Sequence, residues 1–289
     1  MIVSVASGKG GTGKTTVTAS LAVSWPRPVM AVDLDVEEPN LHLFLKPKVT
    51  DTEVVTLEVP EVDESMCTYC RKCAELCQFK AIAVMGRAIM TFPEMCHGCG
   101  GCMAICPEGA IGVGTRELGV MERGVVRGTL PCLTGRLRVG EAMSPPLMRH
   151  VRSRMRAESA AQSLDVLVDT PPGVSCPAMS AVADSDVIVL VTEPTPFGFH
   201  DFKLAWEAFS PYEKPVAVVI NRAGLGDRRV YEFCAAHDLP ILAEIPYRRD
   251  IAEHYSKGMI LAELDAGLGD LFSKLCRDLR ELAKEVRNA

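Results

Sequence analysis

Short apolar runs alternate along most of the chain with longer segments whose apolar residues recur at helical spacing. Short runs of branched aliphatic residues that end at turn residues are typical of buried strands. Strands and helices in alternation predict an α/β fold, a doubly wound and mostly parallel sheet with helices on both faces. The predicted strands are Ile2 to Ala6, Pro28 to Val32, Leu164 to Asp169, Val187 to Thr192, Val216 to Asn221 and Ile241 to Ile245.

Between residues 59 and 115 this alternation stops and the composition changes. Eight of the twelve cysteines fall there in two units, each spaced Cys-x-x-Cys-x-x-Cys-x-x-x-Cys and each followed by Ala-Ile. We therefore expect a discontinuous α/β domain, residues 1–58 and 116–289, with a small α+β domain inserted at residues 59–115.

Two weaker patterns follow the cysteine repeat. Residues 120–130 have the composition of a strand, with a turn expected at Gly124. Ser144-Pro145-Pro146 is a typical helix start, and the helix is expected to run towards Ser163. Its arginines predict a solvated face, and a docking surface for an acidic partner is the less favoured alternative. These arginines are Arg149, Arg152, Arg154 and Arg156.

A glycine-rich segment links the first predicted strand to a helix. Its spacing, Gly8-x-x-x-x-Gly13-Lys14-Thr15, satisfies the P-loop pattern, with strand and helix both in place. Backbone N–H groups of such a loop bind phosphate, Lys14 reaches the terminal phosphates, and the Thr15 hydroxyl ligates Mg²⁺. The expected nucleotide-binding residues are Gly10, Gly11, Thr12, Gly13, Lys14, Thr15 and Thr16.

Acidic residues end two of the predicted strands. Asp33-Leu34-Asp35 follows the second strand, where carboxylates are placed to hold Mg²⁺ or its waters. Asp169 ends the strand that begins at Leu164, as a Walker B carboxylate does, and a stiff turn follows it. A strand-ending turn without function remains the alternative for the weaker Asp-x-Asp motif.

The cysteine spacing itself suggests the metal chemistry. Three cysteines at steps of three wrap one cuboidal iron–sulfur cluster, while the fourth lies too far along the chain and ligates the other cluster. Structural zinc is the alternative, but it does not explain the third and fourth cysteines of each unit. Cluster one would use Cys67, Cys70, Cys73 and Cys106, and cluster two Cys96, Cys99, Cys102 and Cys77. Gln78 stands where a proline usually follows the fourth cysteine, which puts the local turn in doubt.

Lys9, ahead of Gly10-Gly11-Thr12-Gly13-Lys14, makes the loop resemble the deviant Walker A motif of the MinD/Mrp/ParA group. The insert resembles a two-cluster bacterial ferredoxin. The resemblance implies a homodimer, or a dimer with a close paralogue, in which Lys9 touches the partner's nucleotide. It implies that Asp35 positions the attacking water with support from Asp33. It also implies that Asn221 reads adenine, which favours ATP over GTP.

The overall composition narrows the partners. A net charge of −6 argues against a general nucleic-acid binder. The first predicted strand begins at Ile2, no apolar run is long enough to span a bilayer, and the helical stripe from Leu268 to Val286 lacks a basic face. We expect a cytoplasmic protein without a membrane anchor, in which cysteines serve as metal ligands rather than disulfides.

The expected function is that of a Mg²⁺-dependent ATPase with catalytic residues Lys9, Lys14, Asp35 and Asp169, and with ATP, Mg²⁺ and two [4Fe–4S] clusters as cofactors. A nucleotide-gated dimer would couple ATP turnover to electron transfer or to cluster delivery to a redox or metallocluster partner protein. The alternative is a MinD/ParA-like positioning or assembly-scaffold ATPase whose ferredoxin part is structural. A third hypothesis is a plain electron carrier.

Two of the remaining cysteines raise a further hypothesis. Cys176 follows Asp169 in the segment where, in the nitrogenase iron protein of the resembled group, a cysteine ligates a cluster shared by the dimer. Cys132 would supply the second ligand of such an interface cluster. Small buried thiols are the favoured alternative for both residues.

Overall fold

The computed structural model describes residues 1–287, and side chains as far as Lys284. The chain divides into two compact units. The nucleotide unit comprises residues 1–52, 121–136 and those from 148 onward, and the cysteine unit comprises residues 53–120 and 137–147. The cysteine unit is therefore longer than the expected insert and includes a second segment of the chain.

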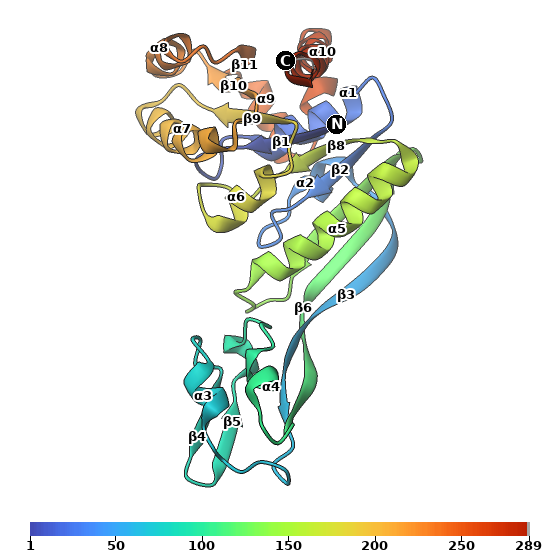
Figure 1. Ribbon diagram of the computed structural model, residues 1–289. Helices are drawn as coiled ribbons and strands as arrows, with labels where there is room; N and C mark the ends of the chain where they lie inside the picture. The colour runs from blue at the N-terminus through green and yellow to red at the C-terminus, as the bar shows by residue number, and fades with distance from the viewer. Residues whose placement is uncertain (288–289) are drawn as a thin grey trace. The chain divides into compact units, whose positions relative to one another are not determined.

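A nine-stranded sheet with the order β11-β10-β9-β1-β8-β2-β7-β6-β3 organises the described chain (Figure 1). The strand pairs β10–β11, β9–β10, β1–β9, β1–β8, β2–β8 and β2–β7 are all parallel. The expectation of an α/β fold with a mostly parallel sheet is confirmed. The strands are β1 (Ile2–Ala6), β2 (Val29–Asp33), β3 (Lys48–Val62), β6 (Ile111–Val126), β7 (Leu130–Leu137), β8 (Asp165–Asp169), β9 (Val187–Thr192), β10 (Val216–Ala223) and β11 (Ile241–Pro246).

Helices cover both faces of the parallel part of this sheet. Side chains alternate along a strand, so Val3 and Val5 face a core shared with α1, α2 and α10, whereas Ala6 faces one shared with α6, α7 and α8. The helices are α1 (Lys14–Ser24), α2 (Leu41–Leu45), α5 (Ser144–Gln162), α6 (Cys176–Val182), α7 (Pro196–Phe209), α8 (Arg229–Ala236), α9 (Arg249–Ser256) and α10 (Ala266–Arg287).

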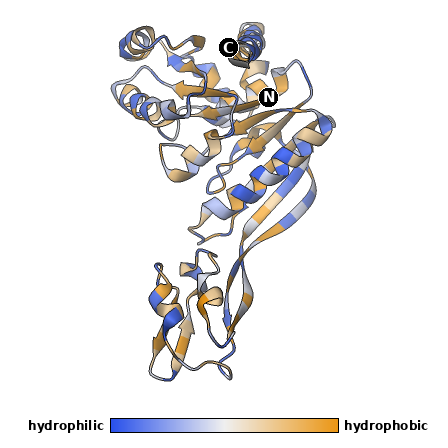
Figure 2. Ribbon diagram, viewed as in Figure 1, coloured by the Kyte–Doolittle hydropathy of each residue, from blue (hydrophilic) through white to orange (hydrophobic). Residues whose placement is uncertain are grey.

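The apolar stripe of α10 packs into the first of these cores. Leu268, Phe272, Leu275 and Leu279 are all at most 3% exposed. The side chain of Val286, the last position of the predicted stripe, lies outside the described residues. No helix in the described part of the chain is long and apolar enough to cross a membrane. Figure 2 shows apolar residues concentrated on the parallel strands of the sheet.

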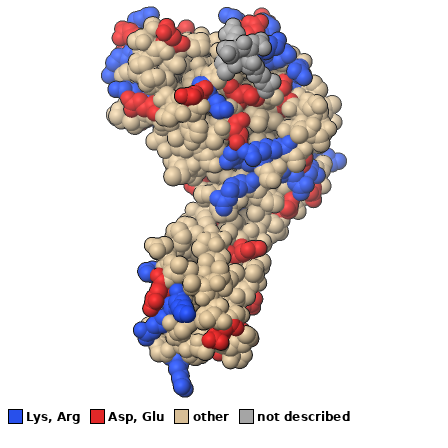
Figure 3. All heavy atoms as spheres, in the orientation of Figure 1, with Lys and Arg blue, Asp and Glu red and all other residues tan. Residues whose placement is uncertain are grey.

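One local expectation is wrong, and a second holds only in part. Gly124 lies inside β6, where a Cβ would come 2.8 Å from Pro47, and the turn falls at residues 127–129 instead. The arginines of α5 do not simply form a solvated face, although Figure 3 shows Lys and Arg side chains gathered over that helix. The side chain of Arg152 is 13% exposed, and its Nε donates to Asp184 across 3.0 Å.

The cysteine unit contains short elements around two small cores. The hairpin strands β4 and β5 pair antiparallel through a turn at Gly86. Cysteines are members of both cores, and Cys73 and Cys96 are buried there. The short elements are β4 (Ile82–Met85), β5 (Ala88–Thr91), α3 (Lys72–Leu76), α4 (Gly101–Ile105) and a 3₁₀ turn (Pro93–Met95).

Candidate functional site

The polar residues of the nucleotide unit gather at one edge of the sheet. Five neighbouring parallel strands end there, and each contributes a polar side chain at or just beyond its carboxyl end. These side chains belong to Ser7 after β1, Asp33 on β2, Asp169 on β8, Glu193 after β9 and Asn221 on β10. This edge is where open parallel sheets bind ligands.

The P-loop is shaped by backbone conformations that only glycine adopts without strain. Gly11 has φ +77° and Gly13 has φ +96°, and α1 begins directly after Gly13. A Cβ on Gly13 would lie 2.4 Å from Nδ2 of Asn221. That amide donates to the Thr12 carbonyl across 2.8 Å, so Asn221, which was expected to read adenine, lies against the P-loop.

One atom of the loop has no partner. The Thr12 hydroxyl is buried, and no hydrogen bond reaches its Oγ1. Such a group is costly unless a ligand or water satisfies it. An orphaned hydroxyl in a glycine-rich loop at the start of a helix fits a bound phosphate.

Lys14, Thr15 and Asp169 converge beneath the loop. The Thr15 hydroxyl donates to Oδ2 of Asp169 across 2.6 Å, and the Thr18 hydroxyl donates to Oδ1 across 3.3 Å. Thr15 and Asp169 were predicted to share the Mg²⁺ site, and the structure brings them together. Thr18 was not predicted, because a threonine one turn into a helix carries no signal until its distant partner is known.

Asp33 and Asp35 have different surroundings. Asp33 is fully buried and accepts the backbone N–H groups of Asp35 at 3.1 Å and Leu41 at 2.9 Å. These two hydrogen bonds fix the loop that carries Asp35, and the supporting role expected of Asp33 stays a prediction. Asp35 is half-buried and has its charge partly compensated by Lys14.

The three carboxyl groups share a low-dielectric site with one lysine. Burial raises the pKa of Asp33 well above its ordinary 3.8, and the charge of Asp169 raises it further. Burial raises the pKa of Asp35 and of Asp169 to about 6, although Lys14 opposes both shifts. Because carboxylates outnumber cations here, a divalent cation would stabilise their charged forms.

The donor set fits Mg²⁺ that arrives with a nucleotide. Within residues 1–287, no three His, Cys, Asp or Glu side chains form a group that could hold a metal ion by themselves. P-loop proteins bind Mg²⁺ through one hydroxyl, phosphate oxygens and water, with a carboxylate behind the water. Thr15 and Asp169 would provide that hydroxyl and that carboxylate.

Lys9 lies in an ion-pair network that the sequence did not reveal. Its Nζ donates to Oε1 of Glu193 across 2.5 Å, and Nη1 of Arg222 donates to Oε2 across 2.8 Å. The Glu193 side chain is only 7% exposed. The signal that could have identified Glu193 from the sequence is an acidic residue at the end of β9, the strand beside β1.

Comparison with known proteins now decides the family. The profile of the CobQ/CobB/MinD/ParA nucleotide binding domain matches residues 3–261. The chain belongs to this family. Two similar proteins are uncharacterised proteins of Methanocaldococcus jannaschii. One is 30% identical over 284 residues and covers 97% of both chains. The other is 29% identical over 299 residues, covering 100% of this chain and 97% of the relative.

A solved structure with the same fold is the septum site-determining protein MinD from Pyrococcus horikoshii, in complex with Mg-ADP. It is 22% identical, has a TM-score of 0.57, and the match covers 98% of this chain and 96% of that one. At this identity the likeness establishes the fold.

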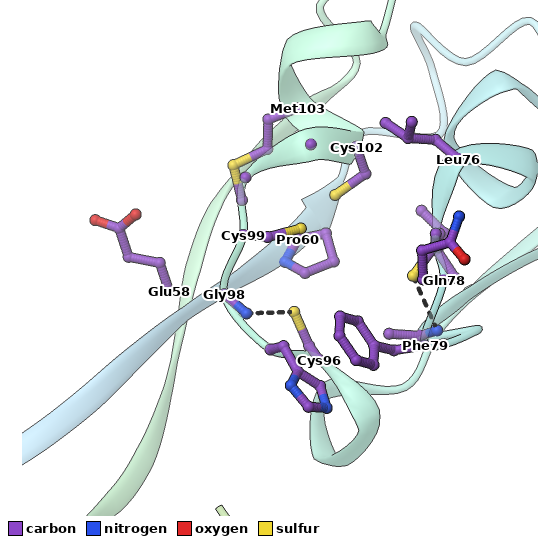
Figure 4. A pocket seen from close by; sticks show the side chains of 16 residues that line it. Glu58, Pro60, Leu76, Gln78, Phe79, Cys96, Gly98, Cys99, Cys102 and Met103 are labelled. Atoms are coloured by element: carbon purple, nitrogen blue, oxygen red, sulfur yellow. Dashed lines mark hydrogen bonds between the residues drawn. The ribbon is translucent and has the colours of Figure 1, made fainter. Parts of the chain in front are cut away.

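The cysteine unit of this family member has two cysteine-lined cavities. The first cysteine site, about 20 Å³, is lined by Cys67, Cys70, Cys73 and Cys106. The second cysteine site, about 260 Å³, is lined by Cys77, Cys96, Cys99 and Cys102. Each cavity thus combines three cysteines of one repeat with the fourth cysteine of the other. Figure 4 shows the sulfur atoms of Cys96, Cys99 and Cys102 around the second cavity.

The backbone repeats along with the sequence. Tyr69 and Gly98, the second residues after the first cysteine of each repeat, have φ +55° and +65°. Their N–H groups each donate to that cysteine's sulfur across 3.4 Å. The turns after Cys77 and Cys106 close with the same 3.3 Å hydrogen bond, so the turn that Gln78 put in doubt is kept.

A buried ion pair supports the second cysteine site. Arg116, on β6, is 8% exposed, pairs with Glu141 and donates to the Cys96 carbonyl across 3.5 Å. Its Nε has no partner. Sequence reasoning missed Arg116 because nothing in the local sequence indicates that it is buried.

The two isolated cysteines have unlike environments. Cys132 is 1% exposed on β7, and burial raises the pKa of its thiol to about 12. A thiol buried within one subunit is not presented to another, so the structure does not favour Cys132 as an interface ligand. Cys176 is exposed at the start of α6.

Proposed function

We propose that this chain is a Mg²⁺-dependent ATPase that switches by ATP-driven dimerisation and carries two [4Fe–4S] clusters in its cysteine unit. The observation that carries the cluster part is the division of eight cysteines between two cavities, each lined by the interleaved set of four that two clusters require. The inserted ferredoxin-like domain belongs to the same proposal.

The cysteines fit iron–sulfur clusters better than zinc. A zinc ion draws four sulfurs to one point about 2.3 Å away. Here the sulfurs of the second cysteine site line a cavity of about 260 Å³. Backbone N–H groups of Tyr69, Ala81 and Gly98 donate to cysteine sulfurs, as donors that tune a cluster do. A bound cluster would supply one-electron redox chemistry.

In the nucleotide unit, the loop N–H groups and Lys14 would hold the phosphates. Thr15 would ligate Mg²⁺, and Asp169 would accept a hydrogen bond from a water on that ion. Asp35 would orient the attacking water while Asp33 holds the loop in place. Asn221 would hydrogen-bond the base, which favours adenine.

Dimerisation would bring Lys9 to the nucleotide of a second subunit. The family supports this arrangement, and the presence of two full-length relatives in one organism is compatible with either a homodimer or a dimer of close paralogues. A site that needs a residue from both subunits couples hydrolysis to association.

Two outputs of this switch are candidates. The comparisons support a positioning or assembly-scaffold ATPase better than electron transfer, since the solved neighbour described above is a septum site-determining protein. The paired cysteine cavities favour redox coupling or cluster delivery, because a scaffold needs no solvent-accessible metal sites. Cys70 and Cys99 are exposed, which suits exchange with a partner.

Anaerobic purification of the whole protein tests the proposal. Two clusters predict about eight irons and eight sulfides per chain, and a zinc-loaded protein without iron would overturn the cluster part. Sedimentation with ATP, ADP or neither tests the dimer. A cluster potential that shifts with a non-hydrolysable ATP analogue supports redox coupling, whereas ATP-dependent co-sedimentation with vesicles or DNA and an unchanged potential support the scaffold.

A further inference from the structure

Lys9 is held within its own subunit by a residue whose position leaves it little freedom. Glu193 follows β9, and its carbonyl accepts the N–H of Thr195 across 2.8 Å. A Cβ on Gly198 would lie 2.2 Å from the same carbonyl, so α7 starts in close contact with the Glu193 backbone. The Glu193 carboxylate is therefore a fixed acceptor, not a mobile one.

The backbone of Lys9 is fixed as well. A Cβ on Gly8 would come 1.9 Å from the Asp201 carbonyl, so the loop packs directly on α7. The Ser7 hydroxyl donates to the Lys9 carbonyl across 2.6 Å. Lys9 can therefore change partners only by swinging its side chain, which is 29% exposed.

Leaving Glu193 has a cost that depends on Arg222. Separating Lys9 from a 7% exposed carboxylate would leave a buried charge, which is strongly unfavourable without another partner. Arg222 occupies the other carboxylate oxygen and keeps it compensated when Lys9 departs. Arg222 itself is 48% exposed and can adjust its position.

We propose that Glu193 is a positioning residue that holds Lys9 in its own subunit, and that Arg222 lowers the cost of releasing Lys9 to the partner's nucleotide. Glu193 then sets the concentration at which ATP drives dimerisation. This inference rests on the proposed dimeric switch. It adds a contact within one subunit, between Lys9 and Glu193, that has to break before the dimer forms.

Substitutions of Glu193 and of Arg222 are expected to shift dimerisation in opposite directions. Glu193→Gln removes the charge that holds Lys9, and both cations can then turn to solvent, so the fold is expected to tolerate it. Half-maximal dimerisation with a non-hydrolysable ATP analogue should occur at about threefold to tenfold lower protein concentration. Arg222→Gln should raise that concentration by a similar factor, because release then strands the carboxylate.

Matched controls separate this mechanism from general damage. Arg249→Gln removes a 93% exposed arginine of the same unit and should change nothing. Glu193→Asp shortens the side chain by one methylene and should act like Glu193→Gln, more weakly. The melting temperature of each nucleotide-free monomer reports folding.

Analytical ultracentrifugation of the full chain over a protein concentration series gives the decision. Loss of dimers in Lys9→Ala with normal dimers in the wild type supports the switch, and a wild type that stays monomeric with the analogue overturns the proposed function. If the wild type dimerises but Glu193→Gln is unchanged or weaker, the inference is wrong. It is also wrong if Glu193→Gln and Arg222→Gln shift dimerisation in the same direction.

Discussion

The nucleotide site and the two cysteine sites are built in opposite ways. The nucleotide site is formed by residues from five strands that are far apart in sequence. The apolar core that packs against the sheet does not include these residues. The cysteine sites come from one local repeat, and their cysteines also belong to the core of the unit: Cys73 and Cys96 are buried there, and other cysteines pack around them.

The two units therefore differ in how far the fold depends on a bound ligand. In the nucleotide unit a buried apolar core already holds the site in shape, so the ligand binds to a finished structure. In the cysteine unit the apolar core is small, and the groups that would bind iron fill its centre. Small domains of this kind commonly obtain their folding free energy from the metal.

Removing iron should have the largest effect, and only on one unit. We expect an iron chelator under anaerobic conditions to abolish hydrogen-exchange protection in residues 63–110, between β3 and β6, because the cysteine core has little else to hold it. Protection of β1, β8 and β9 should persist, as should ATP binding. Mass-spectrometric hydrogen exchange on the whole chain measures both, and protection that survives complete iron loss would contradict the contrast.

Asp169→Asn should abolish hydrolysis while leaving the nucleotide unit folded. Loss of the carboxylate behind the Mg²⁺ water should lower the ATPase rate by about 10²-fold or more. A steady-state phosphate-release assay measures this. Activity within a factor of a few of the wild type would exclude Asp169 from the Mg²⁺ site.

The same variant tests the pH dependence of folding. Because the folded protein raises the pKa of Asp169 from 3.8 to about 6, this group contributes stability that is present below about pH 4 and is lost as the pH rises through 6. The nucleotide-free wild type should therefore gain melting temperature between pH 7 and pH 5. Asp169→Asn should gain less, and at pH 7 it should melt a few degrees, about 2–5 °C, above the wild type. An equal pH response in both proteins would contradict the assignment.

Single cysteine substitutions should separate the two cysteine sites. Cys73→Ser and Cys102→Ser occupy equivalent positions of the repeat, and each should lower the iron content from about eight to about four per chain. Electron paramagnetic resonance of the reduced variants should then show a single cluster. Loss of all iron in both variants would mean that the sites do not load independently.

Alanine substitutions at two pairs of glycines are expected to have the smallest effects. Each pair compares a crowded position with an open one. Gly98→Ala would place a Cβ 2.6 Å from Leu57, and Gly13→Ala would place one 2.4 Å from Asn221. A Cβ added at Gly100 or Gly11 would meet no atom within 4 Å. All four have positive φ, so alanine costs about 1 kcal/mol at Gly100 and Gly11 from backbone strain, and more at their crowded counterparts. Chemical denaturation compares the pairs, and equal losses within a pair would show that the contact adds nothing.

The parts that the sequence predicted are those with local signatures. Strand ends, the P-loop and the interleaved cysteine sets follow from spacing, because a strand, a loop or a repeat is encoded by neighbouring residues. The sheet confirms the predicted strands to within a few residues at each end. The roles of the site residues, and the clusters, stay predictions.

The parts that it did not predict depend on contacts between distant residues. Thr18 and Glu193 acquire meaning only when the sheet brings them to Asp169 and Lys9. Arg152 was expected in solvent because its partner, Asp184, is 32 residues away. The extent of the cysteine unit was underestimated for the same reason.

That unit enters the chain twice, and this limits how it can be removed or moved. A deletion of residues 53–120 would leave residues 137–147 behind, and Glu141, whose side chain is 2% exposed, would lose Arg116. A gene encoding the nucleotide unit alone therefore needs two excisions, with new links at both. A graft of the cysteine unit onto another protein likewise needs two insertion points in the host rather than one.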